Sequence, residues 1–268
     1  MKMIMRIKTG STGLAILVTV LISSYVSAEP GGIYYGASAT LQQAEVLYEK
    51  TVRSRFDAPE QSDGDVSTSD EVMDKPLQWD GLVGFRINFA DGTQFLALQA
   101  ELALSGDDIS GRLPGAGESP NHDQIGDAWP EEWSLETTRS MGAIAKYGIT
   151  RSLLGTFDVS LYGLAGVRQT KIDFFSSFRG CFVAIDCTEE DFRTATQSFD
   201  PEVNLLVAGV GLETGINRKT ALQFEIRYVE DFKDEWVAEF SGEDWDVDAP
   251  GGFTVQNTDF AVKLIRYL

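Results

Sequence analysis

The chain has 268 residues, with 22 Lys and Arg against 41 Asp and Glu, a formal net charge of −19 and 43% hydrophobic residues. This composition excludes a disordered chain, a collagen and a disulfide-rich miniprotein. The negative charge argues against nucleic acid as a partner, because binding a phosphate backbone requires a basic stripe.

The first 28 residues have the pattern of a cleaved secretory signal. Three Lys and Arg residues precede an apolar run at 14–22, and the small residues Val26 and Ala28 follow it. This run is shorter than the roughly 20 residues that span a bilayer. We therefore predict an exported protein with two parts, a signal peptide at 1–28 and one domain at 29–268.

Beyond this signal, apolar residues alternate repeatedly with polar or small ones. In the clearest stretch, Trp79, Val83 and Phe85 alternate with Asp80 and Arg86. Such alternation predicts β-strands with one oily face. The same pattern predicts eight strands, at 33–41, 77–89, 96–104, 135–149, 157–167, 206–212, 222–228 and 260–268.

The connections between these strands are alternately short and long. Three are tight turns, whereas the connections at 43–76, 105–132, 172–202 and 231–252 far exceed the usual loop of about 4–6 residues. Membrane barrels have this alternation, and in lipid the sheet must close so that no backbone group stays unpaired. We predict an all-β fold: an eight-stranded antiparallel up-and-down transmembrane β-barrel with short periplasmic turns and four long extracellular loops.

Several segments resemble those of a known family. Residues 161–167 (Leu-Tyr-Gly-Leu-Ala-Gly-Val), residues 209–213 (Gly-Val-Gly-Leu-Glu) and the terminal strand are similar to the eight-stranded outer-membrane barrels of the OmpA-like and opacity-protein families. The resemblance covers about residues 30 to 268, although the chain ends in Tyr267-Leu268 where the family usually ends in Phe. It implies location in the bacterial outer membrane, insertion by the barrel-assembly machinery, and contact with outer-membrane lipids and lipopolysaccharide.

The inward faces of the predicted strands carry charges of both signs. An eight-stranded barrel leaves an interior just wide enough for side chains, and buried charges must pair because an isolated one costs several kcal/mol. We predict an ion network that plugs the lumen, formed by Asp80, Arg86, Glu101, Lys146, Asp158, Arg168, Glu213, Glu225, Arg227 and Lys263. The alternative use of these charges is a narrow path through a small-solute channel.

The long connections carry two further features. Cys181 and Cys187 are close together in a chain predicted to reach an oxidising compartment, which predicts a disulfide. Clusters of acidic residues in these connections prevent aggregation or, through Ca²⁺ or Mg²⁺, bridge to phosphates of lipopolysaccharide. The stretch from Asp244 to Val255 does not match an EF-hand.

We predict no catalytic, cofactor or protein-held metal site. His122 is the single histidine, and its neighbours Ser119 and Asp123 do not make a triad by proximity in sequence alone. A lipid A-modifying enzyme centred on His122 stays open as an alternative, as does a lipocalin-like periplasmic binder with its apolar face inward. We expect a monomeric barrel with a structural or surface-interaction role and no enzymatic activity.

Overall fold

The regular structure of the described chain consists entirely of β-strands. The computed structural model describes residues 4–7, 32–57, 64–104, 107–114, 131–153, 157–181, 192–217, 219–241 and 245–268. Eight strands form the barrel wall: β2 (Gly32–Phe56), β4 (Leu77–Phe89), β5 (Gln94–Leu104), β7 (Glu131–Leu153), β8 (Phe157–Cys181), β10 (Glu202–Asn217), β11 (Thr220–Ser241) and β12 (Trp245–Tyr267). The additional strands are β1 (Ile4–Ile7), β3 (Gly64–Asp74), β6 (Ile109–Leu113) and β9 (Phe192–Phe199).

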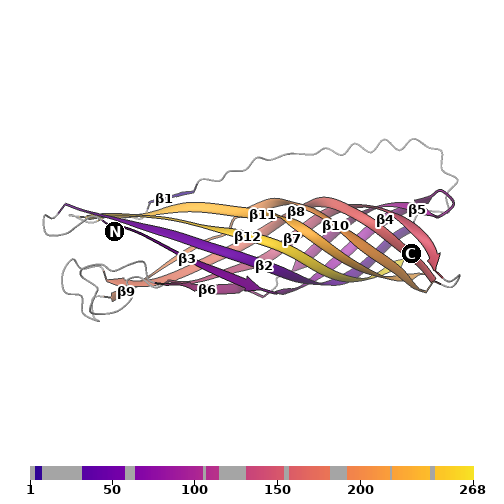
Figure 1. Cartoon of the computed structure of the whole chain (residues 1–268), viewed down its shortest axis with the longest axis horizontal. Helices are drawn as coiled ribbons and strands as arrows, with labels where there is room; N and C mark the ends of the chain where they lie inside the picture. The colour runs from indigo at the N-terminus through magenta and orange to yellow at the C-terminus, as the bar shows by residue number, and fades with distance from the viewer. Residues whose placement is uncertain are drawn as a thin grey trace.

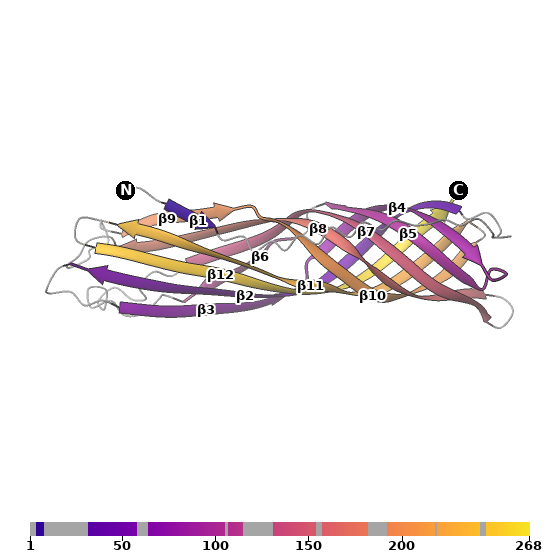
Figure 2. The same ribbon diagram turned by 90° about the horizontal axis from the view of Figure 1, so that it is seen from above.

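The eight wall strands close into a ring. Its order is β2, β4, β5, β7, β8, β10, β11, β12 and back to β2, and each strand is antiparallel to both neighbours. Figure 1 and Figure 2 show the long, tilted strands of this barrel from two sides. The predicted eight-stranded antiparallel barrel is confirmed.

The turn between β4 and β5 shows how the sequence reverses the chain. Ala90, Asp91 and Gly92 have φ angles of 51°, 55° and 80°. The N–H of Gly92 donates to the carbonyl of Phe89 at 3.2 Å, and the hydroxyl of Thr93 donates to the carbonyl of Ala90 at 2.7 Å. Left-handed backbone is easy for Gly and tolerated by Asp, so this stretch forms a tight turn.

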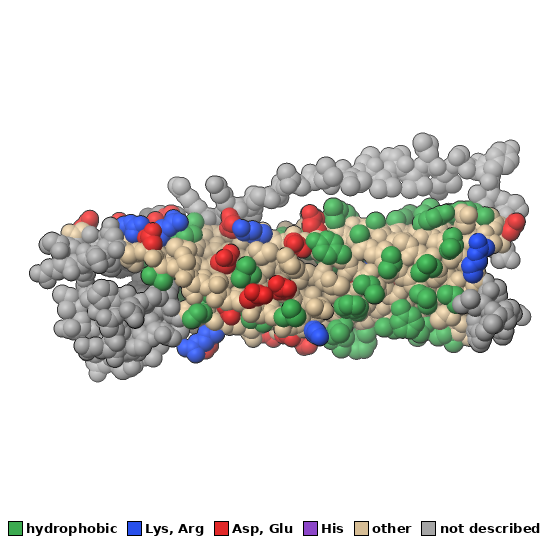
Figure 3. Space-filling model, viewed as in Figure 1, with side chains coloured by type: hydrophobic (Ala, Val, Ile, Leu, Met, Phe, Trp, Pro, Cys, Tyr) green, Lys and Arg blue, Asp and Glu red, His purple; other side chains and the backbone are tan. Residues whose placement is uncertain are grey.

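The barrel has two halves along its axis. We call residues 32–41, 77–104, 140–153, 157–168, 205–217, 219–229 and 258–268 the membrane half, and the other described residues between 42 and 257 the extension. In the membrane half, outward side chains are apolar, and Trp79, Leu161 and Leu264 are more than half exposed. Figure 3 shows the hydrophobic side chains gathered over this half, with acidic and basic ones over the extension. Such an apolar belt is the surface that a barrel presents to lipid.

The extension consists largely of strands where the sequence predicts long loops. The strands β2, β7, β8, β11 and β12 continue into it, and β3, β6 and β9 are added to them. Two sheets result, one in the order β3, β2, β12, β11 and the other in the order β6, β7, β8, β9. These strands lack the oily outward face that identifies the membrane strands, because their apolar side chains point inward.

The short strand β1 falls within the segment predicted to be a signal peptide. It pairs antiparallel with β11, with Ile4 opposite Glu239. The other residues of 1–28 lie outside the described residues, so the signal peptide stays a prediction. In the described ranges, no helix is long and apolar enough to cross a membrane.

Candidate functional site

Charged side chains line the lumen of the membrane half. Strand alternation points them inward. Nine of them are buried residues, and the side chain of the tenth, Glu101, is only 8% exposed. The lumen charges are Asp80, Arg86, Glu101, Lys146, Arg168, Glu213, Glu225, Arg227, Asp259 and Lys263. Five carboxylates therefore balance five cations within a closed wall.

The centre of this lumen network is a cluster around two carboxylates. Glu101 accepts two hydrogen bonds from the guanidinium of Arg227, at 2.7 and 2.6 Å. The ammonium of Lys263 contacts Glu101 and lies 3.0 Å from Glu225 Oε2. Lys146 donates to Glu225 Oε1 at 2.6 Å. Hydrogen bonds between charged groups are the strong kind, so each ion in the cluster is stabilised by an opposite one.

The ion pairs of the network cross the lumen. The strands β5 and β11 lie opposite each other in the ring, so the pair between Glu101 and Arg227 joins opposite walls. The strands β4 and β10 are also opposite, and Arg86 Nη1 lies 2.5 Å from Glu213 Oε1. These pairs brace the barrel across its axis.

Of the ten lumen residues predicted from the sequence, nine line the lumen and Asp158 does not. It shares the inward phase of β8 but is exposed, because it lies at the end of the strand, opposite Ser152 in the register. Asp80 lies inside but pairs with no cation among the described residues. It accepts hydrogen bonds from the hydroxyls of Ser38 and Thr40 at 2.6 and 2.7 Å.

One lumen carboxylate, Asp259, was missed by the sequence prediction. It is fully buried, and its Oδ2 accepts a hydrogen bond from Arg168 Nη2 at 2.7 Å. The predicted final strand begins at Phe260, one residue after it. Extending the alternation of this strand by one residue would have placed Asp259 on the inward face.

An aromatic core lies in the interior of the extension. It comprises Tyr48, Trp133, Phe174, Phe199, Trp236 and Phe253, which come from both sheets. The ring of Tyr48 stacks on that of Trp236 with centroids 5.7 Å apart, and Phe174 stacks on Phe253 at 5.5 Å. The prediction missed this core because it treated these segments as loops. Alternation of apolar side chains on one face of β12 was the available signal.

A buried ion pair accompanies this aromatic core. Glu131 contacts the ammonium of Lys50 and accepts a hydrogen bond from the hydroxyl of Tyr48 at 2.7 Å. The same ammonium lies 4.7 Å from the centre of the Phe178 ring. Burial and the charge of Glu131 raise the pKa of Tyr48 well above its usual value, so the phenol stays a hydrogen-bond donor.

A side chain, rather than a backbone ladder, links β3 to β6. Asp70 on β3 accepts hydrogen bonds through Oδ2 from the N–H of Arg112 and from Nε1 of Trp133, both at 2.8 Å. A Cβ atom at Gly111 would lie 2.2 Å from this oxygen, so glycine permits the close approach. One carboxylate therefore joins the edges of the two sheets.

The remaining predicted features cannot be placed. Cys181 ends β8, but Cys187 lies outside the described residues, and the disulfide stays a prediction. His122 also lies outside them, together with Ser119 and Asp123. Within the described ranges, no group of three His, Cys, Asp or Glu residues could hold a metal ion.

Comparison with known proteins gives likenesses only at the level of structure. No family model and no curated protein matches the chain. Ail, the attachment invasion locus protein of Yersinia pestis, is 14% identical, with 83% of this chain and 98% of Ail covered and a TM-score of 0.30. The outer membrane protease OmpT of Escherichia coli is 8% identical, with 92% and 99% covered and a TM-score of 0.25. The toluene transporter TodX of P. putida is 8% identical, with 88% and 90% covered and a TM-score of 0.23.

With TM-scores this low, the class of the protein rests on its own ring and surfaces. The closed sheet, the exposed apolar belt and the charged interior define a transmembrane β-barrel. An even number of antiparallel strands in one chain, with a tight turn at the end of the membrane half, is the architecture of the outer-membrane β-barrels. The fold is of that class.

Proposed function

We propose that this protein is an integral outer-membrane barrel with a closed lumen, whose extension stands outside the cell as a platform for surface contacts. The observation that carries this proposal is the set of ion pairs between opposite walls of the membrane half. The polar outer face of the extension supports the second part, because charged side chains facing lipid are destabilising.

The lumen is closed for both steric and electrostatic reasons. Eight strands leave room for little more than side chains. Arg227 and Lys263 are 1% and 0% exposed, and both contact Glu101. Moving one of them aside to open a path would leave a buried charge unpaired, at a cost of several kcal/mol. The aromatic core adds a second closure on the side of the extension.

Conductance across a planar lipid bilayer tests the closed lumen. We expect no unitary conductance steps from the refolded wild-type barrel, with insertion verified by its heat-dependent shift in gel mobility. A conducting porin in the same bilayer serves as the positive control. Clear steps from the wild-type protein would overturn the closed lumen and favour a small-solute channel.

Extraction from membranes tests the integral location separately. We expect the protein to stay in the membrane fraction in high salt and to dissolve only in detergent, because its apolar belt is exposed. Release by salt alone would contradict the membrane assignment and favour a soluble binder with the same strands.

The partners we propose follow from this location. The apolar belt contacts outer-membrane lipids, the terminal strand β12 is read by the barrel-assembly machinery, and the barrel is a monomer without enzymatic activity. We also propose that Ca²⁺ or Mg²⁺ bridges acidic side chains of the extension to phosphates of lipopolysaccharide. Calorimetry on barrel refolded with lipopolysaccharide should show heat of binding with Ca²⁺ or with Mg²⁺. Absence of heat with each of the two ions would exclude the bridge.

A further inference from the structure

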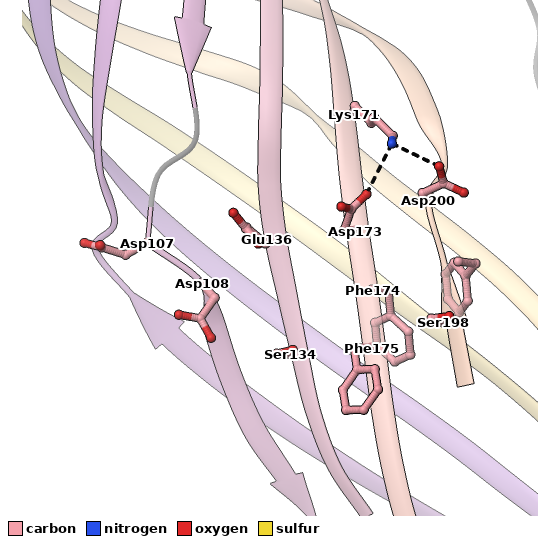
Figure 4. Close-up of a pocket in the computed structure, with 11 residues that line it drawn as sticks. Asp107, Asp108, Ser134, Glu136, Lys171, Asp173, Phe174, Phe175, Ser198 and Asp200 are labelled. Carbon is pink, nitrogen blue, oxygen red and sulfur yellow. Dashed lines mark ion pairs between the residues drawn. The ribbon is translucent and has the colours of Figure 1, made fainter. Parts of the chain in front are cut away.

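A groove lies in the outer wall of the extension, beyond the apolar belt. Its volume is about 590 Å³, and Figure 4 shows the side chains that line it. They come from the segment before β6, from β7, from β8 and from the segment around β9. The volume is within the range of about 300–1,000 Å³ that is usual for small-molecule sites.

Carboxylates dominate the charge of this groove. They come from every wall and are opposed by a single lining cation, Lys171. The five carboxylate residues are Asp107, Asp108, Glu136, Asp173 and Asp200. The electrostatic potential of the groove therefore favours positive charge, and the ammonium group of Lys171 neutralises part of the negative charge.

Lys171 shows how an alkylammonium group lies among these carboxylates. Its Nζ lies 3.0 Å from Asp200 Oδ2 and 3.7 Å from Asp173 Oδ1, as the dashed lines in Figure 4 mark. These carboxylates raise the pKa of Lys171 and keep it charged. Asp173 Oδ1 is shielded from solvent yet accepts no hydrogen bond among the described residues. The groove thus contains a carboxylate oxygen whose contact with Lys171 is too long for a hydrogen bond.

The arrangement suits an extended cation better than a metal ion. The carboxylates are spread across the strands β6 to β9, and in the described ranges they form no group close enough to hold a metal. Neighbouring strands lie about 4.8 Å apart, so three such steps span about 14 Å. This is about the length of four residues of an extended peptide.

An exposed aromatic ring adds an apolar surface to the groove. Phe175 points outward from β8 and is 46% exposed, although its neighbours on that face are polar. An aromatic face attracts ammonium and guanidinium groups and also packs against the alkyl chains that carry them. Charge and ring together match a chain of cationic groups joined by apolar links.

We infer that this groove binds a linear polycation, in which ammonium or guanidinium groups are joined by short alkyl segments, as in a polyamine or a basic peptide. The inference names a ligand class for the proposed surface role. Binding is measured on the purified barrel, so a conducting lumen would overturn the proposed closure without touching the groove.

The first test compares two variants of equal net charge by calorimetry on refolded protein, with spermine and tetralysine as probes. Asp107→Asn with Asp108→Asn removes two groove carboxylates, whereas Asp246→Asn with Asp248→Asn removes two exposed carboxylates from β12. Exposed ion pairs contribute up to about 1 kcal/mol, so we expect the groove variant to bind about fivefold more weakly and the control to change little. Equal weakening in both variants would reduce the effect to general surface charge and overturn the site.

The second test uses a change of opposite sign. Lys171→Ala frees the carboxylates that its ammonium occupies, and we expect both probes to bind about two- to fivefold more tightly. Lys233→Ala removes a cation paired with Glu235 at 2.7 Å elsewhere on the extension and should leave affinity nearly unchanged. An equal gain in both variants, or no binding of either probe to the wild type, would refute the groove. Binding of spermine alone identifies free polyamines as the source, and binding of both probes extends it to basic peptides.

Discussion

The membrane half and the extension use the same strands but exchange the composition of their two faces. On β12, Lys263 faces inward and Val262 outward in the membrane half, whereas Phe253 faces inward and Thr254 outward in the extension. The alternation along β12 is unbroken, so only the surroundings differ. Lipid outside favours apolar outward side chains, and water outside favours apolar inward ones. One continuous strand can therefore present an apolar outer face to lipid in one half of a barrel and an apolar inner face in the other half.

The largest effect we expect comes from breaking the ionic interior of the membrane half. Glu225→Gln removes the charge that faces Lys146, Arg227 and Lys263, all of them buried. Leaving buried cations without their partner typically costs about 3–5 kcal/mol. We expect the free energy of unfolding in detergent to fall by about that amount.

The matched control lies on the same strand. Glu235 is exposed and pairs with Lys233, so Glu235→Gln should change the unfolding free energy by less than about 1 kcal/mol. Similar small losses for both variants would mean that the lumen network contributes little, and the contrast between the two interiors would lose its energetic meaning.

The aromatic core should behave as an ordinary hydrophobic core, so a cavity in it should unfold the extension without unfolding the membrane half. Phe253 is 1% exposed, and replacing a buried Phe by Ala costs about 3 kcal/mol or more. We expect Phe253→Ala to expose the extension to proteases while the membrane half keeps its heat-dependent gel shift. Thr254→Ala, on the outer face, should leave protease resistance unchanged. Loss of the gel shift in Phe253→Ala would show that the two halves fold as one unit.

Sequence alternation predicted the membrane half well and stopped where the extension begins, for a physical reason. Register shifts interrupt β7 between Thr137 and Arg139 and β11 between Val229 and Phe232, near the border of the two halves. A β-bulge inserts one residue, so the side chains that point inward change from odd-numbered to even-numbered positions, or the reverse. One unbroken alternation over the predicted strand 135–149 would place Leu135 on the outer face with Met141, although Leu135 is 3% exposed and points into the extension.

The lumen residues were predictable because charge on the inward phase of a strand is conspicuous beside an oily outer face. Which charges meet was not predictable, since the pairs join strands on opposite walls that are far apart in sequence. The aromatic core was hidden for the opposite reason. Inward Phe and Trp with polar outward neighbours are typical of a strand in a soluble protein. The prediction looked for strands that face lipid, so it treated the segments of the aromatic core as loops.

A smaller effect should follow from separating the two sheets of the extension at β3 and β6. Asp70→Ala removes the acceptor for Arg112 N–H and Trp133 Nε1, and the loss of these bonds should cost about 2 kcal/mol. We expect faster amide hydrogen exchange in β6 with no change in the membrane half. Asp65→Ala on the same strand, whose exposed carboxylate pairs with Arg55, should not change exchange in β6.

The smallest effect we expect concerns Asp234, a buried carboxyl of the extension that pairs with no cation among the described residues. Asp234 faces inward on β11, and burial together with the charge of Glu235 raises its pKa above the ordinary 3.8. The folded state therefore keeps this proton after the unfolded state has lost it. Stability falls as the pH rises from the ordinary pKa through the raised one, because ionised Asp234 is unfavourable in this interior.

Asp234→Asn should consequently stabilise the extension at neutral pH, and the gain should vanish below pH 3.8. The amide oxygen can still accept the N–H of Glu235, which donates to Asp234 Oδ1 at 3.0 Å. Urea unfolding of the extension at neutral and acidic pH measures the difference, with Asp246→Asn as the exposed control. A destabilised variant at neutral pH would mean that ionised Asp234 stabilises the extension and would contradict the expected cost of its burial.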